Sequence, residues 1–213
     1  RLLMNEPFFA ALSRRIEKTR STAIPTAGVR VNPVSAQFEL MYNPEFMGKL
    51  SDRHLVGVLK HEFYHIIFEH VTGRKPSGGL KRIDNVAMDL AINSHIKDEL
   101  PNESNPGPEI NGEAMKACIP GEGMFADYPP NQTYEWYKSR LEDDIEEERR
   151  KGGGDCGGEG DNFADADSFD SHDDFGDADG TTSEIAKERL RDAVKKAAEE
   201  AEKARNWGTV SSD

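Results

Sequence analysis

The stretch His61-Glu62-Phe63-Tyr64-His65 decides how this sequence is interpreted, because two histidines stand four residues apart with a glutamate directly after the first. On an α-helix, side chains four residues apart share one face, about 6 Å apart along the axis, so both imidazoles can reach one ion. Glu62 is rotated by about 100° from His61, where it can hold a water on that ion without binding the ion itself. The pattern predicts a hydrolytic zinc site. The alternative is two helix histidines that face solvent or core.

The surrounding residues predict a helix over 51–72. Ser51 and Asp52 supply an N-cap and a first-turn acid, and Gly73 supplies the stop. Apolar residues recur at helical spacing between them: Leu55, Leu59, Phe63 and Ile66. One stripe of the helix is therefore buried, and the histidine face lies beside it, as a buried metal site requires.

A catalytic zinc site usually has three protein ligands and an open position, so His61 and His65 need a third partner. We favour Asp89, which follows His65 by 24 residues on an otherwise apolar helix predicted over 81–98. That separation allows one loop and an antiparallel return. A lone carboxylate there is costly to bury unless it is paired or bound to a metal. Asn93 lies one turn further on the same face, where it could support the ligand.

Other residues compete for the third position. Asp84 precedes Asp89 by five residues and lies on a different face, and His172 lies in a distant acidic segment. His70 follows the second histidine by five residues, so a continuing helix points it about 140° away, and we expect a helix-end histidine near the C-terminal dipole. His54 lies about 10 Å along the axis from the first histidine, too far to share the ion.

The net charge of −13 is a local property. Residues 142–180 contain 16 acidic and 3 basic residues, whereas the rest of the chain has 24 of each. The folded part is therefore neutral, which argues against a broad nucleic-acid surface. Within this segment, residues 152–180 are rich in Gly and Asp and do not fit a calcium loop, so we expect them to be flexible and quickly cleaved by added protease.

Cys118 and Cys156 are far apart and form no Cys-x-x-Cys pair, so we expect free thiols in a reducing compartment. The sequence has no apolar run of membrane-spanning length and no recognisable signal peptide, and it predicts no membrane association. These features favour a cytoplasmic protein, or a virion protein if the chain is encoded by a phage. We also expect the chain to be a piece of a longer protein.

The remaining patterns predict an α+β protein, rich in helices, with a small antiparallel sheet. The expected helices span 1–20, 44–50, 51–72, 81–98, 132–151 and 182–205, and the expected strands span 27–31 and 37–42 about an Asn32-Pro33 turn. Residues 101–130 are expected to be irregular, with one helical turn near 112–117. The predicted organisation is a domain over 1–140, an acidic flexible segment over 141–180 and a charged helix within 181–213.

Several stretches together resemble a known family. They are Thr26-Ala27-Gly28-Val29, Tyr42-Asn43-Pro44-Glu45-Phe46, Leu59-Lys60-His61-Glu62-Phe63-Tyr64-His65 and Ala87-Met88-Asp89-Leu90-Ala91-Ile92-Asn93. They resemble the zinc metallopeptidase domain of bacterial and phage proteins that often precedes a von Willebrand factor A-like domain. The likeness covers residues 26–101 and extends weakly to 170–175, where the family's Asp-Asp-His is rearranged and its Trp is absent. It implies a zincin-like fold, peptidase chemistry and a following von Willebrand factor A-like domain.

We therefore expect a zinc-dependent peptidase that holds Zn²⁺ through His61, His65 and Asp89, with Glu62 as the general base and a peptide or protein as the substrate. Tyr42 and His172 are candidates for a second donor to the scissile carbonyl. The strand at 37–42 is expected to be the sheet edge to which an extended peptide adds. The alternatives are a noncatalytic zinc-containing component of a larger assembly, such as a phage particle, and an interaction module whose acidic segment binds basic partners.

Overall fold

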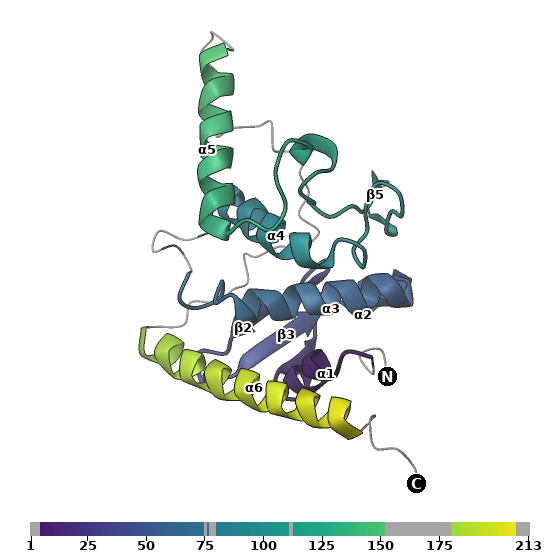
Figure 1. The fold of residues 1–213 in the computed structure, drawn as a ribbon, viewed down its shortest axis with the longest axis vertical. Helices are drawn as coiled ribbons and strands as arrows, with labels where there is room; N and C mark the ends of the chain where they lie inside the picture. Colours follow the sequence, from purple (N-terminus) through teal and green to yellow (C-terminus); the bar gives the residue numbers. More distant parts are fainter. Residues whose placement is uncertain (1–4, 75, 77–79, 111–112, 152–179, 208–213) are drawn as a thin grey trace. The chain divides into compact units, whose positions relative to one another are not determined.

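The computed structural model describes residues 5–74, 76, 80–110, 113–151 and 180–207 (Figure 1). The chain divides into two compact units, of which the first comprises Arg1–Ser77 with Asp170–Asp213 and the second Gly78–Phe169. The expectations for the Gly/Asp-rich stretch, for Cys156 and for His172 fall outside the described residues.

A three-stranded sheet with strand order β1-β3-β2 forms the base of the first unit. β1 (Glu17–Arg20) runs parallel to β3 (Phe38–Tyr42), whereas β2 (Ala27–Val31) runs antiparallel to it. The sheet is therefore mixed, and the prediction of an antiparallel sheet was wrong. β3 is paired on both sides, so the prediction that residues 37–42 form an open sheet edge was also wrong.

Both errors come from β1, which lies where a helix over 1–20 was expected. α1 spans Pro7–Ser13 alone, and the chain re-enters as a strand at Glu17. The strand sequence Glu-Lys-Thr-Arg has no apolar residue, and all four side chains are exposed. An edge strand of this kind carries no period-two signal, because neither of its faces is buried.

The β2–β3 hairpin supplies much of the apolar core of this unit. The side-chain oxygen of Asn32 accepts hydrogen bonds from the backbone N–H groups of Val34 (2.9 Å) and Ser35 (3.1 Å), which closes the expected turn. The register pairs Val31 with Phe38 and runs to the other end of both strands. The strand residues packed beneath the helices are almost inaccessible: Val29, Val31 and Leu40.

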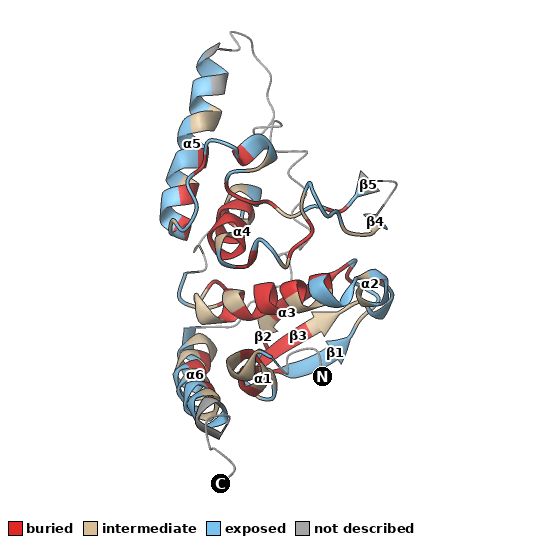
Figure 2. Cartoon of the chain, turned by 45° about the vertical axis from the view of Figure 1, so that its right-hand side comes forward, coloured by how far each residue is buried: buried red, intermediate tan, exposed pale blue. Residues whose placement is uncertain are grey.

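Two capped helices follow the sheet. α2 (Pro44–Lys49) begins at Asn43, whose side chain accepts from the Glu45 N–H, with proline in the first turn. α3 (Asp52–Ile67) begins at Ser51, whose hydroxyl accepts from the His54 N–H at 3.2 Å. α3 packs on β2, and Figure 2 shows the buried residues that run along it. The predicted start is confirmed, but the helix ends five residues before the predicted position 72.

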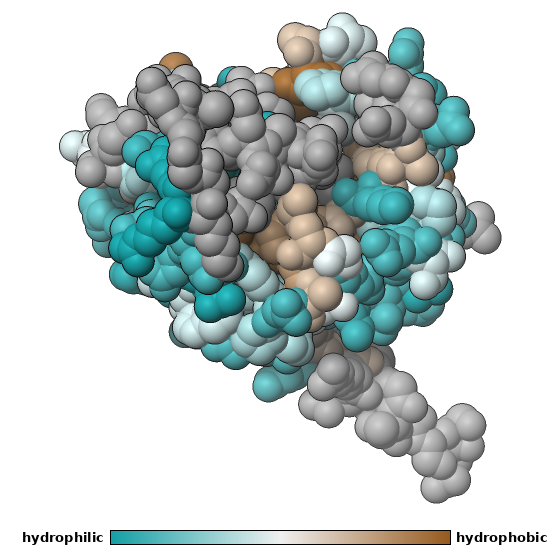
Figure 3. Space-filling view, turned by 90° about the horizontal axis from the view of Figure 1, so that it is seen from above, coloured by the Kyte–Doolittle hydropathy of each residue, from teal (hydrophilic) through white to brown (hydrophobic). Residues whose placement is uncertain are grey.

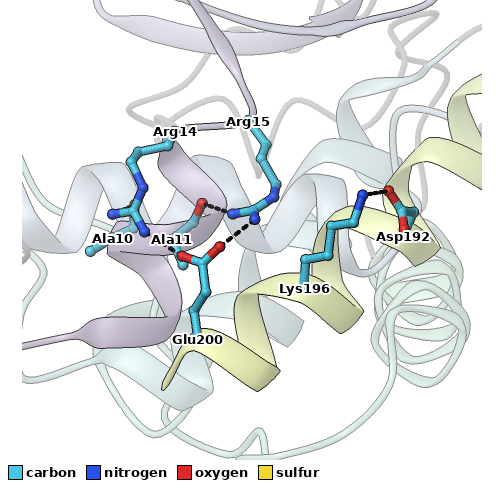
Figure 4. A network of polar contacts seen from close by, with 7 residues as sticks. All are labelled: Ala10, Ala11, Arg14, Arg15, Asp192, Lys196 and Glu200. Atoms are coloured by element: carbon cyan, nitrogen blue, oxygen red, sulfur yellow. Dashed lines mark hydrogen bonds and ion pairs between the residues drawn. The ribbon is translucent and has the colours of Figure 1, made fainter. Parts of the chain in front are cut away.

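α6 (Gly180–Trp207) packs against α1 within the same unit (Figure 1). The contact is polar at its rim, where Glu200 pairs with Arg14 and with Arg15 (Figure 4). Both arginines also donate to backbone carbonyls of α1, at Ala10 and Ala11. The predicted charged helix is confirmed, and its pairs include Glu184 with Lys187 and Asp192 with Lys196. Its buried residues are Ala186, Leu190 and Ala197.

The second unit is centred on α4 (Arg82–Ile96), which packs against α5 (Tyr134–Lys151). Both predicted helices are confirmed to within a few residues. Between them the chain is mostly irregular, with a 3₁₀ turn at Gly123–Phe125. Where a helical turn was expected near 112–117, the strand Glu113–Ala114 (β5) pairs with Glu109–Ile110 (β4), so that prediction was wrong. A strand of two residues is too short to give a periodic signal.

The surface of the described residues agrees with the charged composition. Hydrophilic residues predominate among the coloured residues on the face drawn in Figure 3. No helix within the described parts of the chain combines the length and apolar character needed to cross a membrane.

Candidate metal centre

α3 brings His61 and His65 together inside the first unit. Both side chains are fully buried, and their Nε2 atoms lie 3.0 Å apart. Two nitrogen ligands of a tetrahedral zinc ion are about 3.3 Å apart, since each Zn–N bond is about 2.0–2.1 Å long. The predicted pairing of these two histidines on one helical face is confirmed, and the separation of their ring nitrogens fits a shared ion.

Glu62 lies between the two histidines on α3 and is also fully buried. That Glu62 acts on a water and does not itself bind the metal stays a prediction. Burial from bulk water also favours acid–base work, because electrostatic interactions are stronger in a medium of low dielectric.

Asp89 lies in the second unit, near the middle of α4. It is fully buried, and its neighbours along the helix, Met88 and Leu90, are buried as well. Asn93, one turn further, donates from its side-chain nitrogen to the carbonyl of Cys118 at 2.7 Å. Asp89 is therefore a buried carboxylate between apolar helix neighbours, as the sequence predicted, whereas the side chain of Asn93 binds the loop that follows α4.

His61 and His65 supply two buried imidazoles in the first unit, and Asp89 supplies a buried carboxylate in the second. Two imidazoles and one carboxylate are the donor set of a common class of catalytic zinc site. The residues present therefore fit a zinc ion. Because Asp89 belongs to a different compact unit from the histidines, its role as the third ligand is a proposal.

Asp84, the competing carboxylate, has other partners in the second unit. Its oxygens accept from the Tyr134 hydroxyl (2.8 Å) and the Lys81 N–H (3.0 Å), and Lys138 forms an ion pair with it at 2.7 Å. Burial by itself would raise the pKa of Asp84, but the hydrogen bond from Lys138 and the other donors hold it below its ordinary value. This carboxylate caps α4 and links it to α5.

His70 lies in a position that the sequence did not predict. α3 ends at Ile67, and Glu69 then adopts the left-handed region with φ of 61°. The expectation that a continuing helix points His70 away from the site was wrong. The Nδ1 atoms of His70 and His65 lie 3.1 Å apart, and both rings are fully buried. A glycine at position 69 would have predicted a left-handed residue that ends the helix there, but a glutamate does not.

The chain was also compared with known proteins. A family model described as a putative metallopeptidase domain matches residues 1–211. An uncharacterized protein of Thermotoga maritima is 37% identical over 59 residues, which make up 28% of this chain. The matched part is 15% of the Thermotoga protein's own length. No solved structure matches the chain.

Proposed function

The chain belongs to the family of putative metallopeptidase domains, and from this membership we propose that it is a zinc-dependent peptidase with a zincin-like active site. The observation that carries the proposal is the convergence of two buried imidazole nitrogens, 3.0 Å apart, on the helix that also carries Glu62. The family description supports a peptidase. The donor set supports zinc, because imidazole nitrogen is a preferred ligand of that ion.

His61, His65 and Asp89 would hold the metal in this proposal. A bound zinc ion supplies Lewis acidity, which polarises a carbonyl group and brings the ionisation of water close to neutral pH. The carboxylate of Asp89 would offset part of the charge of a bound metal, whereas the two imidazoles would be neutral ligands. The burial of all three side chains limits competing water ligands.

Glu62 would carry the proton through the reaction. It takes a proton from the attacking water as the water oxygen bonds to the carbonyl carbon of the scissile peptide. It then gives this proton to the amide nitrogen as the carbon–nitrogen bond breaks, which releases an amine and a carboxylic acid. A carboxylate held within hydrogen-bond reach of both groups contributes about 10²–10⁴-fold to such a reaction. The proposed substrate is a peptide or a protein.

Metal content tests the proposal before any substrate is known. Inductively coupled plasma mass spectrometry on the purified protein is expected to find about one zinc ion per chain, and His65→Ala should lose it because two protein ligands hold zinc poorly. His95→Ala is the matched control, since His95 is an exposed histidine of α4. Wild-type protein that takes up no zinc even from added metal would refute the proposal.

A further inference from the structure

The end of α3 brings His70 back to His65 by a defined backbone motif. The N–H of His70 donates to the carbonyl of His65 at 2.9 Å, and the N–H of Glu69 donates to Ile66 at 3.0 Å. Together with the positive φ of Glu69, these bonds form a Schellman motif, in which side chains five residues apart come into contact across the last turn. Apolar residues normally make that contact. Here two histidines make it.

The two ring nitrogens of His65 face different partners. Its Nε2 lies 3.0 Å from Nε2 of His61, on the side of the candidate metal site. Its Nδ1 lies 3.1 Å from Nδ1 of His70, and the two rings meet edge to face with centroids 5.1 Å apart. All three rings are fully buried. His65 therefore has one ring nitrogen toward His61 and the other toward His70.

The hydrogen bond between His65 and His70 constrains which ring nitrogen of each residue carries a proton. A neutral imidazole carries one N–H and one lone pair, so a hydrogen bond between two Nδ1 atoms needs one donor and one acceptor. If the Nε2 lone pair of His65 faces the metal, its proton is on Nδ1, and His70 must accept that proton's hydrogen bond. We propose that His70 is a positioning residue, which holds His65 in the tautomer and orientation that bind the metal through Nε2. This inference rests on the proposed function, in which His65 is a ligand.

The acceptor is an imidazole, whereas a carboxylate, a backbone carbonyl or a water usually takes this place behind a ligand histidine. A neutral acceptor orients His65 without adding negative charge to the site. Loss of such a supporting hydrogen bond typically lowers metal affinity by about 10–100-fold.

Three variants separate the hydrogen bond from the bulk of the ring. His70→Leu keeps an apolar side chain of similar size but cannot accept, whereas the amide oxygen of His70→Gln can. His54→Leu is the control, because His54 is also a buried histidine of the first unit and lies two turns from the site. Zinc dissociation constants are measured by competition with a chromophoric chelator, and circular dichroism checks that each variant is folded.

We expect His70→Leu to bind zinc about 10–100-fold more weakly than the wild type, His70→Gln to recover most of that loss, and His54→Leu to equal the wild type. His65→Ala separates the two claims. If the wild type binds zinc and His65→Ala does not, but His70→Leu binds as tightly as the wild type, the positioning role is refuted while the proposed function stands. If the wild type binds no zinc, both are refuted.

A second measurement does not depend on the variants being folded. Isotope-edited histidine NMR of the zinc-loaded wild type should place the proton of His65 on Nδ1 and that of His70 on Nε2. A His70 ring with its proton on Nδ1 could not accept from His65 and would overturn the inference. Cobalt substitution adds a further test, because a visible spectrum of unchanged shape in His70→Leu is expected if His70 is not a ligand. Loss of one nitrogen ligand from that spectrum would instead make His70 part of the metal's coordination shell.

Discussion

Asp89 is the single residue on which the ligand set depends most. Its carboxylate is buried on α4, in an otherwise apolar stretch of that helix. Asp89→Ala is therefore expected to lower the zinc bound per chain well below that of the wild type, as measured by elemental mass spectrometry after dialysis.

Asp98→Ala is the control for this prediction, because it removes the same charge from an exposed position just after α4. Equal zinc contents in the wild type and in Asp89→Ala would contradict the proposed ligand set and direct attention to a ligand outside the described residues, such as His172.

For single residues, the sequence predicted the positions that follow from the geometry of one helix. The spacing of His61 and His65 places them on one face whatever the rest of the chain does. The contact between His65 and His70 was not predictable in the same way, because it depends on Glu69 adopting a positive φ that glutamate rarely takes. The partners of Asp84 were likewise not predictable, because Tyr134 and Lys138 lie on another helix.

At the scale of elements, the start of α3 is a point where stability can be measured without touching the site. The hydroxyl of Ser51 satisfies the N–H of His54 in the first turn. Ser51→Ala is expected to lower the free energy of unfolding by about 1 kcal/mol, because that donor loses its partner. Chemical denaturation monitored by circular dichroism gives the value.

Ser51→Asp is the matched variant, since aspartate caps helices about as well as serine does and also interacts favourably with the helix dipole. It should retain the wild-type stability. A loss of the same size in both variants would mean that the position is sensitive for a reason other than capping.

The link between α4 and α5 predicts a dependence on pH. The partners of Asp84 hold its pKa below the ordinary value of about 3.9. When the pKa of a carboxylate is lower in the folded state than in the unfolded state, its ionisation stabilises the folded state. This stabilisation is complete above the unfolded-state pKa and is lost as the pH falls through the folded-state pKa. Asp84→Asn should therefore be less stable than the wild type near neutral pH, and the gap should narrow below about pH 4.

Urea midpoints measured across the acid range check this prediction. A difference between wild type and Asp84→Asn that stays constant from neutral pH to well below pH 4 would show that the ionisation of Asp84 contributes nothing, and that the variant acts through packing alone.

The longer helices were predictable because each has buried residues at helical spacing, and α3 also has a serine N-cap at its start. The shorter strands were not. β1 has no apolar residue, and β4 and β5 have two residues each, so their pairing depends on neighbours distant in the sequence. The mixed character of the sheet followed from β1 and was missed with it.

At the scale of the whole molecule, α6 completes the first unit from the far end of the chain. Its Glu200 forms an ion pair with Arg14, which is 186 residues away in the sequence. α6 packs against α1, and some of its own apolar side chains are buried. A chain that ends at residue 179 should therefore melt at a lower temperature than the full chain, because the apolar face of α1 loses its cover. Differential scanning calorimetry measures the shift.

A chain that ends at residue 207 is the control, because it keeps all of α6. It should melt like the full chain. Equal melting temperatures for the chains ending at 179 and 207 would mean that α6 adds no stability. The sequence predicted α6 as a charged helix but not its contact with α1, since local patterns do not encode contacts between the two ends of a chain.

The proposed peptide hydrolysis, with Glu62 as the proton carrier, is best tested by comparing zinc-loaded wild type with Glu62→Gln on a broad peptide library. Glutamine keeps the size of the side chain and a hydrogen bond but cannot take a proton. We expect equal zinc content in the two proteins and cleavage by the wild type that is about 10²–10⁴-fold faster. Wild-type protein that holds one zinc per chain yet cleaves no peptide faster than Glu62→Gln would refute the proposed peptidase activity and favour a noncatalytic zinc-containing component.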